Sequence, residues 1–454
     1  MKIPEHGLDR ETLLQRMESY RANDMPWRDG RTWAYVYDPG QEAEEVIKQA
    51  YMMYLTENAL DPTVFPSTLR FETEVVGNFT SGGTESIMLA VKTARDYARD
   101  KRPHITQPEM VLPATAHASF QKAGHFLDIK PVLVPVNPVS FRADSAAMRK
   151  AITPNTILLV GSAVSYAHGV VDPIRELGQL ALEHKLLLHV DACMGFLLPY
   201  FRRLGAAVPD FEFNVPGVTS ISMDLHKYAF AAKGASTILY RNKELRKYQM
   251  YACSNWTGYT VINSTVQSTK SVGPVAAAWA VLHFFGEAGY LELARQVLEA
   301  TRQVAAGIER IEGLRLVAKP DMNLVAFTSD TVNVFHIIDE MKARGWYVQP
   351  QLGFQSSKEN IHLSINPACT KWIDAFLADL RICVEKARAI KSGGLAASIK
   401  GALANVDPAT LTEESLGQML AMAGIQGTRL PERMADINEV LNALPVSLRE
   451  RLLI

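Results

Sequence analysis

The chain is poor in cysteine, has almost no excess charge and lacks any long apolar run. Its four cysteines, Cys193, Cys253, Cys369 and Cys383, lie far apart without a CxxC pair, so we expect neither a disulfide framework nor a zinc site. Lys and Arg total 47 against 48 Asp and Glu, a balance that creates no general attraction for nucleic acid or an anionic membrane. No apolar stretch reaches the roughly 18 residues of a membrane helix, and the N-terminus lacks a signal-peptide core. We therefore expect a soluble, cytoplasmic protein without a metal.

The pattern that is present is an alternation of short apolar runs with segments of helical period. It extends from about residue 70 to about residue 245, and the runs are rich in branched side chains. Such alternation predicts an α/β fold with a mostly parallel sheet covered by helices on both faces, and ligands then bind at the carboxyl ends of the strands. We expect strands at the following places: 110–112, 132–136, 156–160, 186–190, 219–223 and 236–240.

The length of 454 residues exceeds what one hydrophobic core usually serves. We expect an N-terminal arm over 1–60 and a large domain over 61–311, which ends in a long helix from about 273 to 311. A smaller α+β domain over 312–454 follows, and its tail, after a hinge at 392–394, has a helical pattern.

Three groups of residues that suit one cofactor stand at the ends of predicted strands. Segment 80–86 reads Thr-Ser-Gly-Gly-Thr-Glu-Ser and opens a helix, where backbone N–H groups and the helix dipole favour a phosphate. Asp191 follows the fourth predicted strand, and a buried carboxylate there needs a cationic partner such as the ring nitrogen of pyridoxal 5′-phosphate (PLP). His226 and Lys227 follow the fifth, and a partly desolvated lysine can hold PLP as a Schiff base. Each part alone has an ordinary structural explanation, but the joint spacing favours a PLP site.

His117 stands at the start of another helix, after the strand at 110–112. A surface or capping histidine is the simpler alternative. Its place at a strand end, like that of the other groups, favours a ring stacked on the cofactor and able to steer protons.

These residues also carry a resemblance to a known family. Besides segment 80–86, the runs are Ala-His-Ala-Ser-Phe at 116–120, His-Gly-Val-Val-Asp-Pro at 168–173, His-Val-Asp-Ala-Cys at 189–193 and Asp-Leu-His-Lys-Tyr at 224–228. From about Trp27 to the tail, the chain resembles the sphingosine-1-phosphate lyases, a branch of the PLP-dependent group II decarboxylases with the aspartate-aminotransferase (type I) fold.

The resemblance implies a PLP-dependent carbon–carbon lyase. Such an enzyme cleaves phosphorylated long-chain bases, for example sphingosine 1-phosphate, to a fatty aldehyde and phosphoethanolamine. It also implies a homodimer with shared active sites, in which the loop 268–270 reaches the partner's cofactor. The cofactor-binding residues that it implies, with Lys227 as the Schiff-base lysine, are Gly83, Thr84, His117, Asp191, His226 and Lys227.

On the substrate side, the resemblance places Tyr37 and Lys233 near the substrate's phosphate and gives Tyr166 a part in proton transfer. Asp61 stands where the lyases usually have a histidine that helps to hold that phosphate, and a carboxylate there would repel it. The small residues that the lyases have before the tyrosine that Tyr37 matches are replaced here, giving Trp33-Ala34-Tyr35-Val36-Tyr37, and we expect the change to narrow the adjoining wall of the site.

Two other functions remain open at this stage. An amino-acid decarboxylase of the same fold would need an arginine for the substrate's carboxylate, whereas the lyase would use a basic cluster that includes Lys233 and Lys270. A catalytically inactive scaffold could also keep the fold, although Lys227, Asp191 and His117 are all present.

Overall fold

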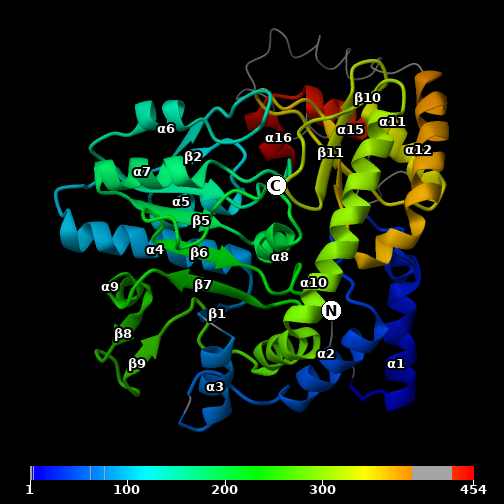
Figure 1. The fold of residues 1–454 in the computed structure, drawn as a ribbon. Coiled ribbons are helices and arrows are strands. Elements are labelled where there is room, and N and C mark those ends of the chain that lie inside the picture. The colour runs from blue at the N-terminus through cyan, green and yellow to red at the C-terminus, as the bar shows by residue number, and fades with distance from the viewer. Residues whose placement is uncertain (1–2, 4, 62, 76, 391–431, 454) are drawn as a thin grey trace.

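The computed structural model describes residues 3, 5–61, 63–75, 77–390 and 432–453, and Figure 1 shows the course of the chain. The expected hinge at 392–394 and most of the expected helical tail lie outside these residues. Among the helices in the described ranges, none is long and apolar enough to cross a membrane.

A seven-stranded, mostly parallel sheet forms the centre of the molecule, as the sequence predicts. Its strand order is β1-β7-β6-β5-β4-β2-β3, and only β7 runs antiparallel to both of its neighbours. All six predicted strands are present, and the short edge strand β1 is an addition. The bounds are β1 (Asn78–Thr80), β2 (Glu109–Pro113), β3 (Lys130–Val134), β4 (Thr156–Ser162), β5 (Leu187–Asp191), β6 (Ser220–Met223) and β7 (Ser236–Tyr240).

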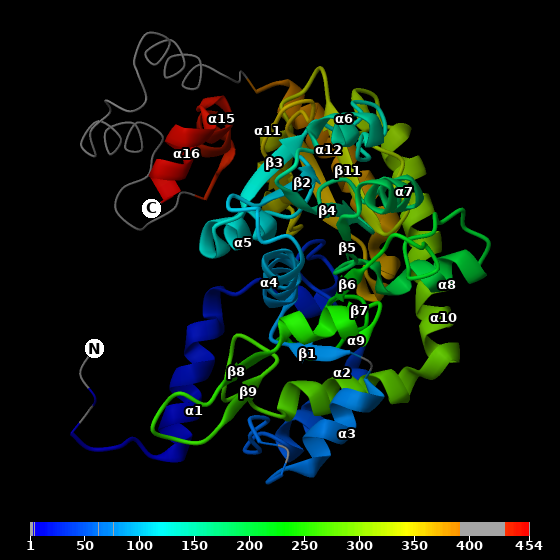
Figure 2. The same cartoon turned by 90° about the vertical axis from the view of Figure 1, so that its left-hand side faces the viewer.

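Alternate residues of the strands supply two hydrophobic cores, one on each face of the sheet. In β4, Leu159 belongs to the core under α7 (Ile174–His184) and α8 (Leu198–Arg203), whereas Leu158 and Val160 belong to the core under α4 and α5. Figure 2 shows α4 and α5 on one side of the sheet and α7 and α8 on the other. Because both faces are covered, the strands carry apolar side chains on both faces, which explains the continuous runs in the sequence.

The remaining helices before the small sheet also have defined bounds. The helix α10 contains a kink at Gly286, which has non-helical dihedral angles of φ 54° and ψ −174°. The helix α3 and the hairpin β8–β9 are not expected from the sequence pattern. The bounds are α1 (Arg10–Ser19), α2 (Gln41–Met53), α3 (Pro66–Glu74), α4 (Gly83–Lys101), α5 (Ser119–Leu127), α6 (Ser145–Ala151), α9 (Lys243–Arg246), β8 (Tyr251–Cys253), β9 (Val261–Asn263) and α10 (Gly273–Glu309).

A four-stranded antiparallel sheet of order β10-β11-β13-β12 forms the second, smaller unit. Together with its helices, this sheet gives the unit the α+β composition that the sequence predicts. The bounds are β10 (Leu314–Leu316), β11 (Leu324–Ser329), α11 (Val334–Ala343), β12 (Gln349–Gln351), β13 (Asn360–Ser364), α12 (Ile373–Arg388), α15 (Ala435–Ala443) and α16 (Val446–Leu453).

The N-terminal arm joins this small unit through Trp33. The Trp33 N–H donates to the carbonyl of Tyr347, and its own carbonyl accepts from the N–H of Ser364. The Trp33 ring is completely buried and stacks on Phe376 with 4.0 Å between ring centroids. The expectation that Trp33 narrows the wall of the site is therefore wrong, because the ring is a core residue of the small unit.

Candidate active site

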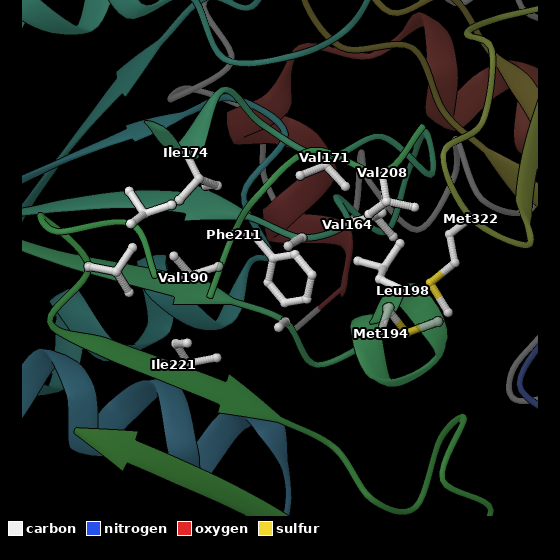
Figure 3. Packing of buried hydrophobic residues seen from close by; sticks show 14 of the residues in the cluster. Val164, Val171, Ile174, Val190, Met194, Leu198, Val208, Phe211, Ile221 and Met322 are labelled. Atoms are coloured by element: carbon white, nitrogen blue, oxygen red, sulfur yellow. The ribbon is translucent and has the colours of Figure 1, made fainter. Parts of the chain in front are cut away.

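A cavity of about 390 Å³ lies where the carboxyl ends of the parallel strands converge. It is lined by residues that follow β1, β2, β4, β5 and β6, which is the position that the topology of an open α/β sheet predicts for a ligand site. The hydrophobic core reaches it through Val164 and Met194, which line the cavity and pack with the buried residues in Figure 3. We call this space the cofactor cavity. Of the predicted site residues, those that line it are Gly83, Thr84, His117, Tyr166, Asp191, His226 and Lys227.

Lys227 forms an ion pair with Asp224 inside this cavity. The distance from Lys227 Nζ to Asp224 Oδ2 is 2.9 Å, and the Asp224 side chain is almost fully buried. Burial lowers the pKa of Lys227, but the charge of Asp224 and other neighbours outweighs it and leaves the pKa above its usual value. Burial also raises the pKa of Asp224, while Lys227 and His226 lower it more strongly. The pair is thus charged, as a buried acid and base in contact are expected to be.

Asp191 is fixed at the end of β5 by two hydrogen bonds. The N–H of Cys193 donates to Asp191 Oδ1 over 3.0 Å, and the Ser222 hydroxyl donates to the same oxygen over 3.3 Å. Neither of these bonds uses Oδ2. His189, two residues earlier, is held between Ser220 and Ser222, and burial lowers its pKa to about 4, so it is neutral near pH 7.

The loop before α4 approaches the Lys227–Asp224 pair closely. A Cβ atom at Gly83 would lie 2.7 Å from Asp224 Oδ2 and 2.9 Å from Cys193 Sγ, so only glycine fits there. The next residue, Thr84, lies 3.0 Å from the Ser119 hydroxyl, which in turn lies 2.8 Å from Nδ1 of His117. This chain of hydrogen bonds ties the exposed ring of His117 to the N-terminus of α4.

Tyr166 is held by two residues of the small sheet. Its hydroxyl donates to Oε1 of Gln349 over 2.6 Å, and its ring stacks on His362 with 4.4 Å between centroids. Burial raises the pKa of Tyr166 above its usual value. The hydroxyl is therefore protonated at neutral pH and acts as a hydrogen-bond donor.

Tyr37 and Lys233 adjoin the cofactor cavity without lining it. The Tyr37 hydroxyl contacts the sulfur of Met194 at 3.9 Å, and burial raises its pKa to about 12. The Lys233 ammonium lies 4.5 Å from the centre of the Tyr37 ring and donates to the carbonyl of His226. Lys233 is exposed as a whole residue, but its ammonium lies among protein atoms. Desolvation of the ammonium is the larger cause and repulsion from Lys227 the smaller one, and together they lower the pKa of Lys233 to about 8.

Asp61 and Lys270, which the sequence analysis places near the substrate, do not line the cofactor cavity of this chain. Asp61 is exposed, and its Oδ1 accepts hydrogen bonds from the N–H and hydroxyl of Thr63. Lys270 forms an ion pair with Glu72 at 3.4 Å. The roles expected of Asp61 and Lys270 stay predictions.

Sequence reasoning missed four residues that organise the site: Asp224, Ser119, Ser222 and Gln349. Asp224 stands three residues before Lys227, directly after β6, and this spacing was a usable signal for a partner of the lysine. Ser119 and Ser222 are small polar residues without a distinctive pattern. Gln349 meets Tyr166 across 183 positions of sequence, so no local signal connects them.

The cavity fits PLP in charge and shape. Its volume suits a small aromatic cofactor, Asp191 is the anion that a protonated ring nitrogen needs, and Gly83 leaves the N-terminus of α4 open to a phosphate. The buried hydroxyl of Ser162 also lines the cavity and has no hydrogen-bond partner among the described residues. A polar ligand would satisfy it.

Comparison with protein families gives two matches. Residues 62–330 match the pyridoxal-dependent decarboxylase conserved domain, and residues 397–454 match a family described as "Pyridoxal-dependent enzyme, C-terminal putative HTH domain". The sphingosine-1-phosphate lyase of Arabidopsis thaliana is 42% identical over 420 residues, which are 87% of this chain and 76% of that protein. The lyase of Rattus norvegicus is 35% identical over 91% of this chain and 75% of its own length. A probable L-aspartate decarboxylase of Pyrococcus furiosus is 32% identical over 78% of this chain and 96% of its own.

Solved structures share the fold. The sphingosine-1-phosphate lyase of Burkholderia pseudomallei superposes with a TM-score of 0.82 at 32% identity, over 89% of this chain and 96% of that one. The glutamate decarboxylase of Lactobacillus brevis has a TM-score of 0.75 at 19% identity, over 87% and 96%. The second likeness concerns the fold alone, which is the predicted type I architecture.

The ion pair predicts how Asp224 affects loading of the cofactor. Because a lysine amine reacts with an aldehyde only when deprotonated, PLP capture by the cofactor-free protein should accelerate as the pH rises. Asp224→Asn removes the anion that raises the pKa of Lys227, so more of the lysine is deprotonated at a given pH and capture at pH 8 should be about tenfold faster or more, the factor that corresponds to one pKa unit. Stopped-flow absorbance gives the rate, and the surface variant Asp330→Asn is the control. Unchanged or slower capture by Asp224→Asn would contradict the assignment.

Proposed function

The chain belongs to the pyridoxal-dependent decarboxylase family and, within it, to the sphingosine-1-phosphate lyases, and from this membership we propose its reaction. The protein is a PLP-dependent lyase. We propose that it cleaves the bond between Cα and Cβ of phosphorylated long-chain bases such as sphingosine 1-phosphate, which yields a fatty aldehyde and phosphoethanolamine. The observation that carries this proposal is the ammonium of Lys233, held over the Tyr37 ring at the edge of the cofactor cavity. There it can meet a substrate phosphate while the substrate's amine meets Lys227.

We propose a separate role in PLP binding for each of the following residues of the cavity. Lys227 would be the attachment point, Asp191 would pair with the ring nitrogen, and His117 would lie against the ring. Gly83, Thr84 and His226 would surround the phosphate. The chemistry that PLP would supply here is storage of the electron pair released when a bond at the substrate's α-carbon breaks.

The tyrosines and Lys233 act on the substrate. Cleavage transfers the β-hydroxyl proton to a base, a role that we propose for His117, which lines the cavity, and it later adds a proton at Cα. Because Tyr37 and Tyr166 keep their protons at neutral pH, they serve as donors that orient substrate oxygens and return a proton. Tyr166 is the better placed, since it lines the cavity and Gln349 fixes its hydroxyl.

We also propose a homodimer with shared active sites. Support comes from large hydrophobic side chains that stand exposed on α2 and the β8–β9 segment, including Met52, Met53, Trp256, Tyr259 and Ile262. These elements lie in the lower part of both ribbon views. Patches of this kind commonly mark interfaces. In such a dimer, Asp61 and the loop 268–270 of one subunit would approach the site of the other.

We also propose a division of the chain into domains and a cytoplasmic location. The chain would consist of an arm over 1–60, a large PLP-binding domain over 61–311 and a small domain over 312–454. The hydrogen bonds of Trp33 to the small sheet suggest that the arm links the two. The wide spacing of the four cysteines supports a cytoplasmic location.

Product analysis tests the proposed reaction. The purified protein with PLP is incubated with sphingosine 1-phosphate and, separately, with aspartate, glutamate and aromatic amino acids. We expect a long-chain aldehyde and phosphoethanolamine from the first and no carbon dioxide from the others, with Lys227→Ala as the inactive control. Carbon dioxide without aldehyde would establish an amino-acid decarboxylase, and no product from any of them would favour a scaffold.

The pKa of Lys233 predicts a pH dependence of substrate binding. A lysine with a pKa of about 8 is charged below that pH and loses its charge above it, so KM for a phosphorylated substrate should rise as the pH passes 8. Lys233→Arg keeps its charge and should shift this rise to higher pH. Lys233→Met should show a raised KM with little pH dependence. Superimposable profiles for the wild type and Lys233→Arg would mean that another group holds the phosphate.

A further inference from the structure

A second cavity, of about 330 Å³, adjoins the cofactor cavity. Both are lined by His117 and Tyr166, so the two spaces meet at these residues. The second cavity extends away from Lys227 between the loop after β2, the loop after β4 and the segment 351–357 of the small unit. We call it the side pocket.

The lining of the side pocket is neutral. Its apolar part comes from Val136, Phe141, Leu352, Phe354 and several alanines. Among the described residues that line it, none is an aspartate, glutamate, lysine or arginine. By contrast, the carboxylates of Glu85, Asp191 and Asp224 and the ammonium of Lys227 line the cofactor cavity.

His168, the other histidine of the wall besides the exposed His117, does not supply a charge. His168 is 2% exposed, and its ring stacks on Phe141 with 4.4 Å between centroids. Burial lowers the pKa of His168 to about 4, so the ring is neutral at neutral pH. Its Nε2 lies 3.0 Å from the Ser357 hydroxyl and links the wall after β4 to the segment 351–357.

The segment 351–357 is a tight turn supported from behind by the C-terminal helices. Phe354 and Ser357 exchange two backbone hydrogen bonds of 2.8 and 3.0 Å, which close the turn. Asn442 of α15 accepts from the Gly353 N–H over 2.6 Å and donates to Glu359 over 3.3 Å. One side chain thus holds the chain on both sides of the turn.

The helix that carries Asn442 is itself firmly docked on the small unit. The N–H groups of Met434 and Ala435 at its start donate to the two carboxylate oxygens of Asp339. Ala435 belongs to the core of the small unit. The position of Asn442, and with it the turn, is therefore fixed by the packing of α15.

We propose that the side pocket receives the hydrocarbon chain of the substrate and that Asn442 is a positioning residue for its wall. This inference rests on the proposed function and specifies it further. A substrate with its amine at Lys227 and its phosphate at Lys233 must direct a long alkyl chain into a space without charges. The side pocket is such a space, and it opens from the cofactor cavity beside Tyr166.

A series of phosphorylated 2-amino-3-hydroxyalkanes with alkyl chains of increasing length tests the pocket. Burial of one methylene contributes about 0.8 kcal/mol, which corresponds to about a fourfold change. In the wild type, kcat/KM should rise by up to that factor for each methylene until the pocket is full. Phe354→Asp places a charge in the pocket and should reduce this rise to less than about twofold, while the shortest substrate keeps its kcat/KM.

Phe126→Asp is the matched control. Phe126 is also an exposed phenylalanine, on α5, and does not line the pocket. The control should keep the dependence on chain length. An unchanged dependence in Phe354→Asp, or an equal loss for short and long substrates, would overturn the proposal.

A second pair of variants, both on α15, tests the positioning role of Asn442. Asn442→Ala releases Gly353 and should weaken the dependence on chain length, with little change for the shortest substrate and no change in the pH profile of KM. Asn438→Ala, whose side chain does not contact the turn, should behave as the wild type. If Asn442→Ala and Asn438→Ala behave alike, Asn442 has no positioning role for the wall of the side pocket.

Binding of analogues separates the pocket from the proposed reaction. Analogues without the 3-hydroxyl cannot be cleaved between Cα and Cβ, so their dissociation constants report binding alone. If these constants fall with chain length in the wild type and not in Phe354→Asp, the pocket is supported even where no cleavage is observed, and only the proposed reaction fails. If chain length has no effect on binding in the wild type, the pocket is excluded.

Discussion

The ion pair between Lys227 and Asp224 is the interaction on which the rest of the site depends. Two opposite charges are stable in so buried a position only when they remain in contact, and their contact sets the positions of the elements around them. Asp224 directly follows β6, so the pair is anchored to the central sheet. The same carboxylate leaves no room for a side chain at Gly83, and the N-terminus of α4 can therefore come close to the lysine. The lysine, the anion that raises its pKa and the expected phosphate site thus form one unit.

Around this unit the protein places groups from distant parts of the chain by hydrogen bonds. Ser119 joins the start of α4 to His117, Ser222 joins β6 to Asp191, and Gln349 brings the small sheet to Tyr166. Small hydroxyl and amide groups suit this task, because each satisfies a buried polar partner without adding charge. In the proposed function, the charged groups serve the cofactor and the substrate's phosphate. The side pocket is also built from neutral groups. Its wall carries no charge, and Asn442, which supports the wall, contacts the outer side of the turn.

The sequence predicted the parts of this structure that local patterns encode. Apolar runs located the parallel strands, and residues directly after them, such as Asp191 and Lys227, were identified because the ends of parallel strands share one edge of the sheet. Contacts across long stretches of sequence left no local signal. Trp33 was assigned to the wall of the site, although its burial depends on Phe376, and Gln349 was not connected with Tyr166. The side pocket depends on a turn of the small unit and a helix about 90 residues further along, so no pattern within either segment predicts it.

We propose that Lys227 alone carries the cofactor. Reduction of the PLP-loaded protein with borohydride makes the link permanent, and peptide mass spectrometry then identifies the modified lysine. We expect one pyridoxyl-phosphate group for each chain, on Lys227, and none in the Lys227→Ala protein. Modification of Lys233 in its place, or a wild-type protein that carries no such group, would contradict it.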